Sequence, residues 1–286
     1  MDLKSETVKS ETLHAGFAAV RVLSPFIPEQ RGRNKAPSLL VCALPYPEQP
    51  EQPEHGCLIA PFAQRNYYRE AVLRLQKLAR IFRNAWGGKP SHYQILCNSP
   101  IAEKPLAVAC GLGVMGKNDL VITREVGSRC IIAAMTLPFD MPSDRCDDSF
   151  KPCARCAACI QQCPTGALTI EGVFKRLRCI QWYASGHEKT VPEYVARVWG
   201  RRLYGCTECQ DCCPWNMDHT VGIESSLGIL PPSIDGDMLL NMEDEAIKQF
   251  FKGTVLGHAW IGPQTIRRNV QLSQSWMNHY HVSPVS

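Results

Sequence analysis

The sequence predicts an α+β fold in which a first region of mixed strands and helices precedes a cysteine-rich module. Apolar runs of strand length alternate with helical stretches over residues 1–148. Cysteines are concentrated in residues 149–220, and a mainly helical segment is expected over residues 221–286. A chain of 286 residues with 45% hydrophobic content can form one large core and a small second module. The expected domains are therefore 1–148, 149–220 and 221–286.

Four strand-like runs and several helical stretches are expected in the first region, and one of the helices is the clearest. This helix spans Tyr67–Phe82, where apolar side chains recur at helical spacing and basic side chains lie between them. The apolar set is Val72, Leu73, Leu75, Leu78 and Ile81. The basic set, read as a solvated face, is Arg69, Arg74, Lys77 and Arg80. The strand-like runs are Ser38–Tyr46, His92–Ser99, Leu120–Thr123 and Cys130–Leu137.

The last region is expected to be helical around Glu243–Phe251 and then to end in a polar tail. Such a tail is loosely ordered unless it docks on the rest of the protein. A second irregular segment, Pro47–His55, is rich in proline and polar residues and is expected to be a loop.

The sequence also predicts a cytoplasmic protein with no membrane partner. Residues Met1–His14 are polar and charged and do not resemble a signal peptide. The longest strongly apolar stretch, Cys130–Phe139, is far shorter than the roughly 20 residues that a membrane helix needs. In a reducing compartment, the fifteen cysteines are more typical of metal binding than of disulfides.

The strongest motif is Cys153-x2-Cys156-x2-Cys159-x3-Cys163-Pro164, and a second run contains Cys206, Cys209 and Cys213-Pro214. A CxxCxxC loop binds three corners of a [4Fe–4S] cubane, and the fourth cysteine of such a run binds the neighbouring cluster. We therefore expect two clusters that move electrons one at a time. The ligands predicted for cluster one are Cys153, Cys156, Cys159 and Cys213, and those for cluster two are Cys163, Cys179, Cys206 and Cys209.

A pair of zinc sites is the alternative use of eight cysteines, but zinc ribbons have separated CxxC pairs rather than this run. Cys212 is adjacent to Cys213 and is expected not to be a ligand. The six remaining cysteines are expected to be buried small hydrophobic residues. They are Cys42, Cys57, Cys97, Cys110, Cys130 and Cys146.

Basic residues surround the predicted ligands, and two roles for them are open. They either stay solvated or dock a low-potential electron donor of the ferredoxin or flavodoxin type. The formal net charge of +4 does not favour nucleic-acid binding, because two clusters with their thiolates add about −4. The basic residues are Lys151, Arg155, Arg176, Arg178, Arg201 and Arg202.

The run Leu203–Asn216 resembles the second cluster motif of the epoxyqueuosine reductase family. Other pieces fall in the same order and at similar spacing over about residues 15–270. They are Ala43–Tyr46, Arg65–Tyr68, Glu103–Leu106, Gly111–Lys117, Gly127-Ser128, Cys179, Pro192–Gly200 and Arg267–Asn269.

That family is iron–sulfur and cobalamin dependent and reduces an epoxide on a modified tRNA base. The resemblance implies a nitroreductase-like domain that binds a corrinoid above cluster one, with the two-cluster ferredoxin-like module inserted in it or following it. The glycines of the Gly111–Lys117 turn suit close approach to a planar ligand, and a plain turn is the alternative. The residues implied for the corrinoid are Tyr68, Gly111, Gly113, Gly116, Lys117, Gly127 and Ser128.

The chain departs from the family pattern at its expected proton donor. The family has an aspartate before a Ser-x-Pro-like step, whereas the matching place here reads Cys97-Asn98-Ser99-Pro100. An amide is not a general acid, and Glu103 or Glu125 would have to substitute, although a structural ion pair is the simpler role of each. Only about 17 residues follow Asn269, fewer than a tRNA-binding helical repeat needs. Val114 also stands where the family usually has an aromatic residue.

Three functions remain open from the sequence. The favoured one is a corrinoid-dependent reductase that acts on another substrate, or on the corrinoid of a partner protein. The second is an epoxyqueuosine reductase that acts on tRNA. The third is a ferredoxin-like carrier without a corrinoid.

Overall fold

The computed structural model describes residues 3–27, 36–48, 53–217, 222–223 and 225–280. Part of the loop expected at Pro47–His55 and the end of the expected tail lie outside these ranges. The chain forms two compact units that alternate along the sequence. Unit 1 comprises Met1–Pro47, Tyr67–Cys156 and Pro214–Glu224. Unit 2 comprises Glu48–Asn66, Ala157–Cys213 and Ser225–Ser286, so the division differs from the three consecutive domains expected from the sequence.

Unit 1 is built on a four-stranded antiparallel sheet with the order β1-β2-β7-β4. Its helices are α1 (Leu3–His14), α2 (Tyr67–Trp86), η2 (Pro90–His92), α3 (Glu103–Ala109) and α8 (Pro214–Met217). The sheet strands are β1 (Ala19–Leu23), β2 (Ser38–Pro45), β4 (Ile95–Leu96) and β7 (Cys130–Leu137). A separate antiparallel pair is formed by β5 (Val114–Met115) and β6 (Val121–Ile122).

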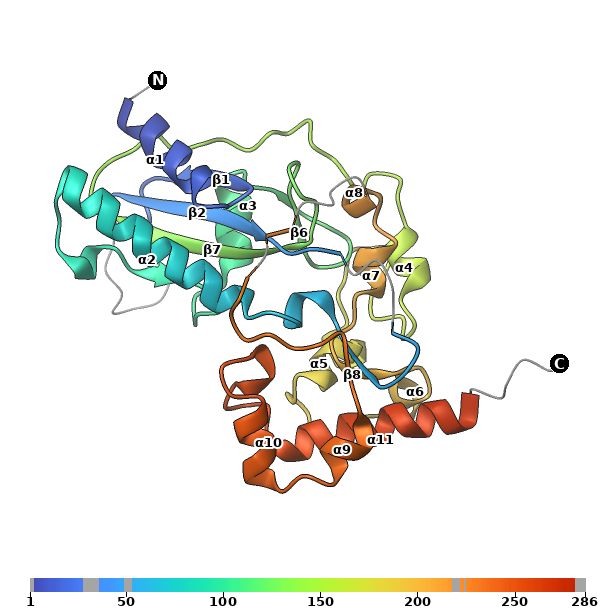
Figure 1. Cartoon of the computed structure of the whole chain (residues 1–286). Coiled ribbons are helices and arrows are strands. Elements are labelled where there is room, and N and C mark those ends of the chain that lie inside the picture. Colours follow the sequence, from blue (N-terminus) through green and yellow to red (C-terminus); the bar gives the residue numbers. More distant parts are fainter. Residues whose placement is uncertain (1–2, 28–35, 49–52, 218–221, 224, 281–286) are drawn as a thin grey trace. The chain divides into compact units, whose positions relative to one another are not determined.

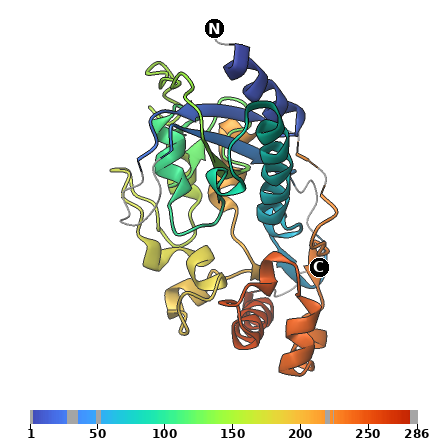
Figure 2. The same ribbon diagram turned by 90° about the vertical axis from the view of Figure 1, so that its left-hand side faces the viewer.

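The central strands β2 and β7 confirm the expectation of long apolar strands. Every residue of β2 is buried, and β2 pairs with β7 in a register that aligns Ser38 with Leu137 and Pro45 with Cys130. Both faces of the sheet are covered: α3 packs on the face of Leu39 and Val41, and α2 contacts β7 and β4. Figures 1 and 2 show these two helices on opposite sides of the sheet. The expected strand at His92–Ser99 is reduced to the two residues of β4.

Helix α2 begins at the predicted residue and continues one turn further, to Trp86. Its buried face differs from the predicted one, because Leu73 and Ile81 are 42% and 39% exposed. The basic side chains are mostly solvated as expected, but Arg74 bonds to Glu70 and to the carbonyl of Ala15. The face that packs on unit 1 consists of Tyr67, Ala71, Leu75, Leu78 and Phe82.

Unit 2 consists of short elements around a small sheet with the order β8-β3-β9. Strand β3 pairs with β8 in parallel and with β9 in the antiparallel sense. The strands are β3 (Cys57–Ile59), β8 (Arg202–Tyr204) and β9 (Ser233–Ile234). The first helices are η1 (Pro61–Ala63), α4 (Ala158–Gln162), η3 (Arg176–Arg178), α5 (Ile180–Ala184), α6 (Glu193–Ala196) and α7 (Glu208–Asp211). The later helices are α9 (Gly236–Leu240), α10 (Asp244–Phe250), η4 (Val255–Gly257) and α11 (Pro263–Tyr280).

The expectation of a loose polar tail is wrong for residues 263–280, which form the 18-residue helix α11. Its buried face includes Ile266, Asn269, Val270 and Ser273, all at most 1% exposed. These positions have helical spacing, but half of them are polar, and a search for apolar periodicity therefore misses the helix. The expected helix around Glu243–Phe251 is confirmed as α10.

Polar side chains fasten α11 to the rest of unit 2. The Asn269 amide donates hydrogen bonds of 2.9 Å to the carbonyls of Ala184 and Leu203. Arg268 donates to the carbonyls of Tyr183 and Glu188, and burial lowers the pKa of its guanidinium. Buried carbonyls that lose their donors cost free energy, so this helix is held by specific hydrogen bonds as well as by packing. None of the described helices is long and apolar enough to cross a membrane.

Candidate iron–sulfur centre

Two one-turn helices of unit 2 carry cysteines of the two motifs and pack against each other. Helix α4 contains Cys159 and is capped at its C-terminus by Cys163. Helix α7 contains Cys209, and α4 and α7 are in contact. The backbone N–H of Cys163 donates to the carbonyl of Cys159 at 3.1 Å, which closes the α4 turn. The CxxxC and CxxC spacings thus fold locally as tight turns that face one another.

Four thiols of unit 2 lie near enough to Cys209 to act on the pKa of its thiol. The pKa of Cys209 is raised, first by burial and then by the charges of neighbouring thiols. Those neighbours are Cys206, Cys179, Cys159 and Cys163. Three of them are the other ligands predicted for cluster two, so the structure brings that predicted set together.

Cys206 lies in a buried environment beside one positive charge. Burial raises the pKa of its thiol to about 11, while Arg202 acts in the opposite direction and lowers it. Arg202 is itself paired with Glu208 and donates to the carbonyl of Trp199 at 2.6 Å. Arg201 is likewise used internally, with bonds to the carbonyls of Pro53 and Gly56. Arg201 and Arg202 are half-buried and bonded within unit 2, and the two roles expected for them stay predictions.

Cys163 receives hydrogen bonds from the segment that follows it. The backbone N–H of Ala167 donates to the Cys163 Sγ at 3.3 Å, and the Thr165 hydroxyl lies 3.6 Å from the same sulfur. Hydrogen bonds to a thiolate stabilise its charge and help to set the potential of a cluster that it binds. The motif spacing does not reveal these donors, because they come from a turn after Pro164.

The thiols are arranged differently from the ligands of one metal ion. In the described part of the chain, no three His, Cys, Asp or Glu side chains converge closely enough to hold a single ion. A cubane does not need such convergence, because each of its four irons takes one cysteine and the ligands stand apart around it. The chemistry of the donor set, four half-buried thiols of unit 2, fits a [4Fe–4S] cluster.

The ligands predicted for cluster one are divided between the units. Cys153 and Cys156 belong to unit 1, whereas Cys159 and Cys213 belong to unit 2, so this set stays a prediction from the sequence. Within unit 1, the Lys117 ammonium donates to the Cys156 carbonyl at 2.8 Å. Lys117 was implied to bind the periphery of a corrinoid, but in this structure it holds the backbone of the cysteine loop.

The other cysteines are only partly as expected. Cys42, Cys57 and Cys110 are buried, and burial raises the pKa of each thiol. Cys97 and Cys130 are half-buried, and Cys146 is exposed, which contradicts the expectation of burial for Cys146. Cys212 is half-buried, and its exclusion from the ligand set stays a prediction.

The glycines implied for a corrinoid are required by packing within unit 1. A Cβ at Gly111 would lie 2.5 Å from the Arg145 carbonyl, and one at Gly113 would lie 2.4 Å from the Ile122 carbonyl. A Cβ at Gly116 would lie 2.6 Å from the Asn118 side chain. The Gly111–Lys117 turn is therefore explained by close approach of the protein's own chain.

Gly127 and Ser128 contact Trp215 and Asn216, which follow the second cysteine run. The Asn216 Oδ1 accepts a 2.8 Å hydrogen bond from the Ser128 backbone N–H, and both side chains are buried. Gly127 has a φ of 59°, and a Cβ there would lie 2.2 Å from Asn216 Oδ1. Phe150 packs edge-on against Trp215 in the same region. These contacts fix the residues after Cys213 onto the sheet of unit 1.

The position of the family's acid lies on an exposed turn. Asn98 is exposed and has a φ of 51°. Glu103 accepts a 3.0 Å hydrogen bond from the Ser99 backbone N–H, and its charge raises the pKa of the Cys97 thiol, after the larger effect of burial. The Cys97 thiol in turn donates to the carbonyl of Tyr68. Glu103 therefore holds the turn, and Glu125 pairs with Arg21 at 3.0 Å, as the simpler structural role predicts.

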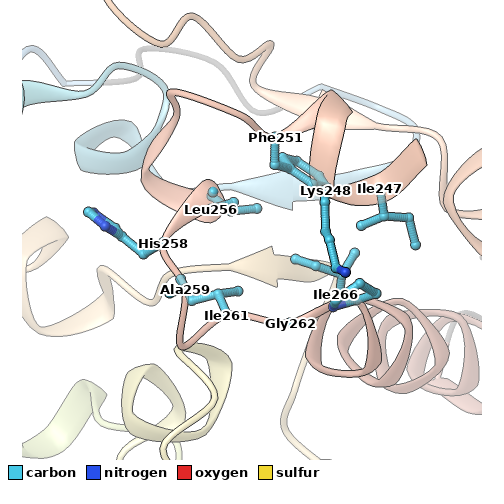
Figure 3. Close-up of a pocket in the computed structure, with 11 residues that line it drawn as sticks. Ile247, Lys248, Phe251, Leu256, His258, Ala259, Ile261, Gly262 and Ile266 are labelled. Carbon is cyan, nitrogen blue, oxygen red and sulfur yellow. The ribbon is translucent and has the colours of Figure 1, made fainter. Parts of the chain in front are cut away.

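A cavity of about 260 Å³ in unit 2 lies apart from every residue predicted for a site (Figure 3). Its walls come from α10, η4 and the start of α11 and are mainly aliphatic, with Phe251 as the aromatic member. The Lys248 side chain extends across it toward Gly262 and Ile266 in the close-up. No sequence motif marked this cavity, because its lining residues follow no recognisable spacing.

Comparison with known proteins gives the same family for sequence and fold. Residues 152–216 match the 4Fe-4S double cluster binding domain. The chain is 31% identical to epoxyqueuosine reductase of Vibrio cholerae over 217 residues, which are 72% of this chain and 55% of that protein. The enzyme of Salmonella typhimurium is 34% identical over 152 residues, 53% of this chain and 39% of that protein. The chain thus spans about half the length of these curated relatives.

The fold is shared with solved structures of the same name. The structure of epoxyqueuosine reductase from Streptococcus thermophilus has a TM-score of 0.80 at 20% identity, with 98% of this chain and 83% of that chain covered. A structure of epoxyqueuosine reductase with an epoxyqueuosine-modified tRNA stem loop has a TM-score of 0.77 at 21% identity and covers 96% and 82%. The cysteine runs, the matched domain and this fold together place the chain in the epoxyqueuosine reductase-like family of double [4Fe–4S] proteins.

Proposed function

We propose that this protein is an iron–sulfur reductase that relays single electrons through two [4Fe–4S] clusters. The observation that carries the proposal is the gathering of Cys163, Cys179 and Cys206 around Cys209 in unit 2. A [4Fe–4S] cluster supplies one-electron transfer when it is bound. The chain's own residues supply the thiolates, and the Ala167 N–H and the Thr165 hydroxyl stabilise the sulfur of Cys163.

Cluster one is proposed from the sequence motif and from the matched domain. The experiment is anaerobic reconstitution followed by iron and sulfide analysis. We expect about eight irons and about eight sulfides per chain, since each cubane holds four of each. A value near four after full reconstitution would contradict the two-cluster proposal and leave only the set around Cys209.

Cobalamin as the electron acceptor is supported by the family resemblance alone. The residues that the resemblance names do not form an open cradle in this structure. The space beside each glycine is filled by neighbouring backbone or side-chain atoms, Lys117 is bonded to Cys156, and Ser128 is bonded to Asn216. Titration of the reconstituted protein with cobalamin tests this part. A visible spectrum that stays the sum of protein and free cofactor would favour the ferredoxin-like carrier.

The substrate is proposed to be other than, or additional to, epoxyqueuosine, and the feature of the structure that favours this is Asn98. Opening an epoxide leaves an alkoxide that must be protonated, and a positioned acid typically contributes about 10²–10⁴-fold to such a step. The exposed amide of Asn98 cannot supply that proton. The relatives described above are named epoxyqueuosine reductases, so a true epoxyqueuosine reductase acting on tRNA is the alternative function.

We expect poor turnover of an epoxyqueuosine-containing stem-loop by the unmodified protein and a gain of activity in Asn98→Asp. The gain follows from placing a carboxyl group where the family has its acid. Product formation by mass spectrometry of the digested RNA measures both. Efficient turnover by the unmodified chain would reject a different substrate, and Glu103→Gln would then test whether Glu103 is the acid.

A further inference from the structure

The segment Pro164–Arg178 is an exposed loop whose two ends are predicted ligands of cluster two. Cys163 precedes it and Cys179 follows it, and the loop joins α4 to α5 in unit 2 (Figure 1). Its base is fixed, because Lys175 N–H donates to the Ala167 carbonyl at 2.8 Å and Leu168 bridges Phe174. A partner that contacts the end of the loop at Arg176–Arg178 is therefore within three residues of Cys179, a predicted ligand of cluster two.

Three large aliphatic side chains of this loop are exposed. Ile170, Val173 and Leu177 are 69%, 57% and 56% exposed. Single exposed aliphatic residues are normal, but three within eight positions of one loop are the kind of feature that marks an interaction surface.

Cations accompany these aliphatic side chains. The loop contains Lys175, Arg176 and Arg178 against a single carboxylate, Glu171, so its net charge is positive. Lys175 contributes to lowering the pKa of Glu171, after hydrogen bonds to the carboxylate from the backbone and Thr169. Among the described residues, no carboxylate lies within ion-pair distance of Arg176 or Arg178.

The two arginines are held in place by aromatic rings. The Arg176 guanidinium lies 4.5 Å from the centre of the Trp182 ring, and that of Arg178 lies 5.2 Å from the Tyr194 ring. Tyr194 is 45% exposed, and its hydroxyl donates to the Leu177 carbonyl at 3.0 Å. Stacking fixes the charges at the surface while their N–H groups stay available to an acceptor.

We propose that this loop, with Trp182 and Tyr194, is the docking surface for the acidic face of a small electron-donor protein that reduces cluster two. An aliphatic centre with a charged rim is the usual anatomy of a protein–protein contact. A nucleic-acid surface is more polar and more uniformly basic, so the three aliphatic side chains favour a protein. The inference rests on the proposed electron relay.

The step on this surface is a transfer of one electron without bond formation. A reduced low-potential flavin or iron–sulfur protein loses the electron, and the oxidised cluster gains it. Opposite charges accelerate such an encounter by about 10–10³-fold at low ionic strength, and salt removes the effect. The role of the loop residues is to bind and orient the donor.

The test compares two double charge reversals in the holoprotein. Arg176→Glu with Arg178→Glu changes the proposed surface, and Lys248→Glu with Lys252→Glu makes the same change in net charge on and just after α10. Reduction of the clusters is followed by stopped-flow absorbance with reduced flavodoxin and, separately, with a reduced acidic [2Fe–2S] ferredoxin. Dithionite serves as a reductant that needs no docking surface, and iron content is measured for every variant.

We expect the loop variant to react with at least one protein donor about tenfold more slowly at low salt, and the difference to vanish at high salt. Dithionite reduction, iron content and the α10 variant should match the unmodified protein. Equal rates of cluster reduction by the protein donors in the two variants would overturn the proposal. It would also be overturned if neither protein donor reduced the clusters of the unmodified protein faster than a neutral viologen, a small reductant that needs no docking surface. Failure of dithionite to reduce the clusters of the unmodified protein would instead reject the electron relay itself.

A second loop variant tests the proposal if Arg176→Glu with Arg178→Glu does not retain its clusters. Ile170→Asp with Val173→Asp alters exposed side chains, adds acidic charge and leaves both stacked arginines in place. We expect the same selective loss of rate with the protein donor. An epoxyqueuosine stem-loop that competes with the donor in the unmodified protein but not in the loop variants would assign the surface to RNA and overturn the proposal.

Discussion

The sheet of unit 1 and the cysteine region of unit 2 are ordered by different kinds of interaction. Strands β2 and β7 have eight residues each and are almost entirely buried, and each buried aliphatic side chain contributes about 1.5–3 kcal/mol. Helices α4, α5, α6 and α7 have only four or five residues each. Helices of that length are not stable alone, so their order must come from their surroundings.

Unit 2 supplies those surroundings with one compact core and with polar fastenings. Trp199 is fully buried among Ile180, Tyr183 and Val195, and its indole N–H donates to the Arg202 carbonyl at 2.7 Å. The proposed cluster would add four further attachments, one at each thiolate. The comparison teaches that buried apolar area orders unit 1, whereas hydrogen bonds and thiolate ligands from a few specific residues order the short helices of unit 2.

The largest effect is expected from removing a cluster ligand. Cys206→Ala should reduce iron from about eight to about four per chain and should increase amide hydrogen exchange over residues 157–213, because bound metal supplies folding energy there. Strands β2 and β7 should keep their protection. Iron analysis and hydrogen-exchange mass spectrometry measure the two effects.

Cys212→Ala is the matched control for that change. It removes a half-buried thiol six residues further along the chain, at the end of α7, and we expect both clusters and the exchange pattern to be unchanged. Loss of iron in Cys212→Ala would show that the predicted ligand set is wrong. Equal loss of protection in β2 and β7 after Cys206→Ala would show that the two units do not differ in the way proposed.

Two leucines of α2 test the apolar side of the comparison. Leu75 is fully buried, and Leu75→Ala should lower the free energy of unfolding by about 2–5 kcal/mol. Leu73 is 42% exposed, and Leu73→Ala should cost less than about 1 kcal/mol. Chemical denaturation measures both. The sequence pattern alone treats the two leucines as equivalent, so equal costs would support the pattern and contradict the packing described here.

Apolar periodicity predicted the elements of unit 1 well, because burial and sequence agree there. Strand β7 begins and ends at the predicted residues, and α2 begins at Tyr67 as expected. The exact buried face of α2 could not be predicted, since it depends on how the helix is rotated against the sheet. Gly111, Gly113 and Gly116 were noticed, but whether a ligand or the protein's own backbone approaches them is decided by distant residues such as Arg145 and Ile122.

In unit 2 the cysteine spacing predicted the candidate site, but few other features of this unit could be predicted from the sequence. The ligand set around Cys209 follows from the two motifs, because the geometry of a cubane is encoded in short spacings. The donors to Cys163 and the polar face of α11 are not encoded in a period. They arise from turns and from tertiary packing, and no local rule distinguishes a buried asparagine such as Asn269 from an exposed one.

Asn269 gives the smallest and most specific test of the comparison. Asn269→Ala removes two hydrogen bonds, to the carbonyls of the fully buried residues Ala184 and Leu203. We expect a loss of about 2 kcal/mol in the free energy of unfolding, since an unsatisfied buried polar group costs about 1–3 kcal/mol.

Asn269→Asp keeps the acceptor for Arg268 but not the donors, and it should cost at least as much, because it places a carboxylate beside two carbonyls. Gln264→Ala, an exposed change on the same helix, should be nearly neutral. If Asn269→Ala proves as neutral as Gln264→Ala, α11 is held by apolar packing of Ile266 and Val270 alone, and unit 2 resembles unit 1 more than its hydrogen bonds indicate.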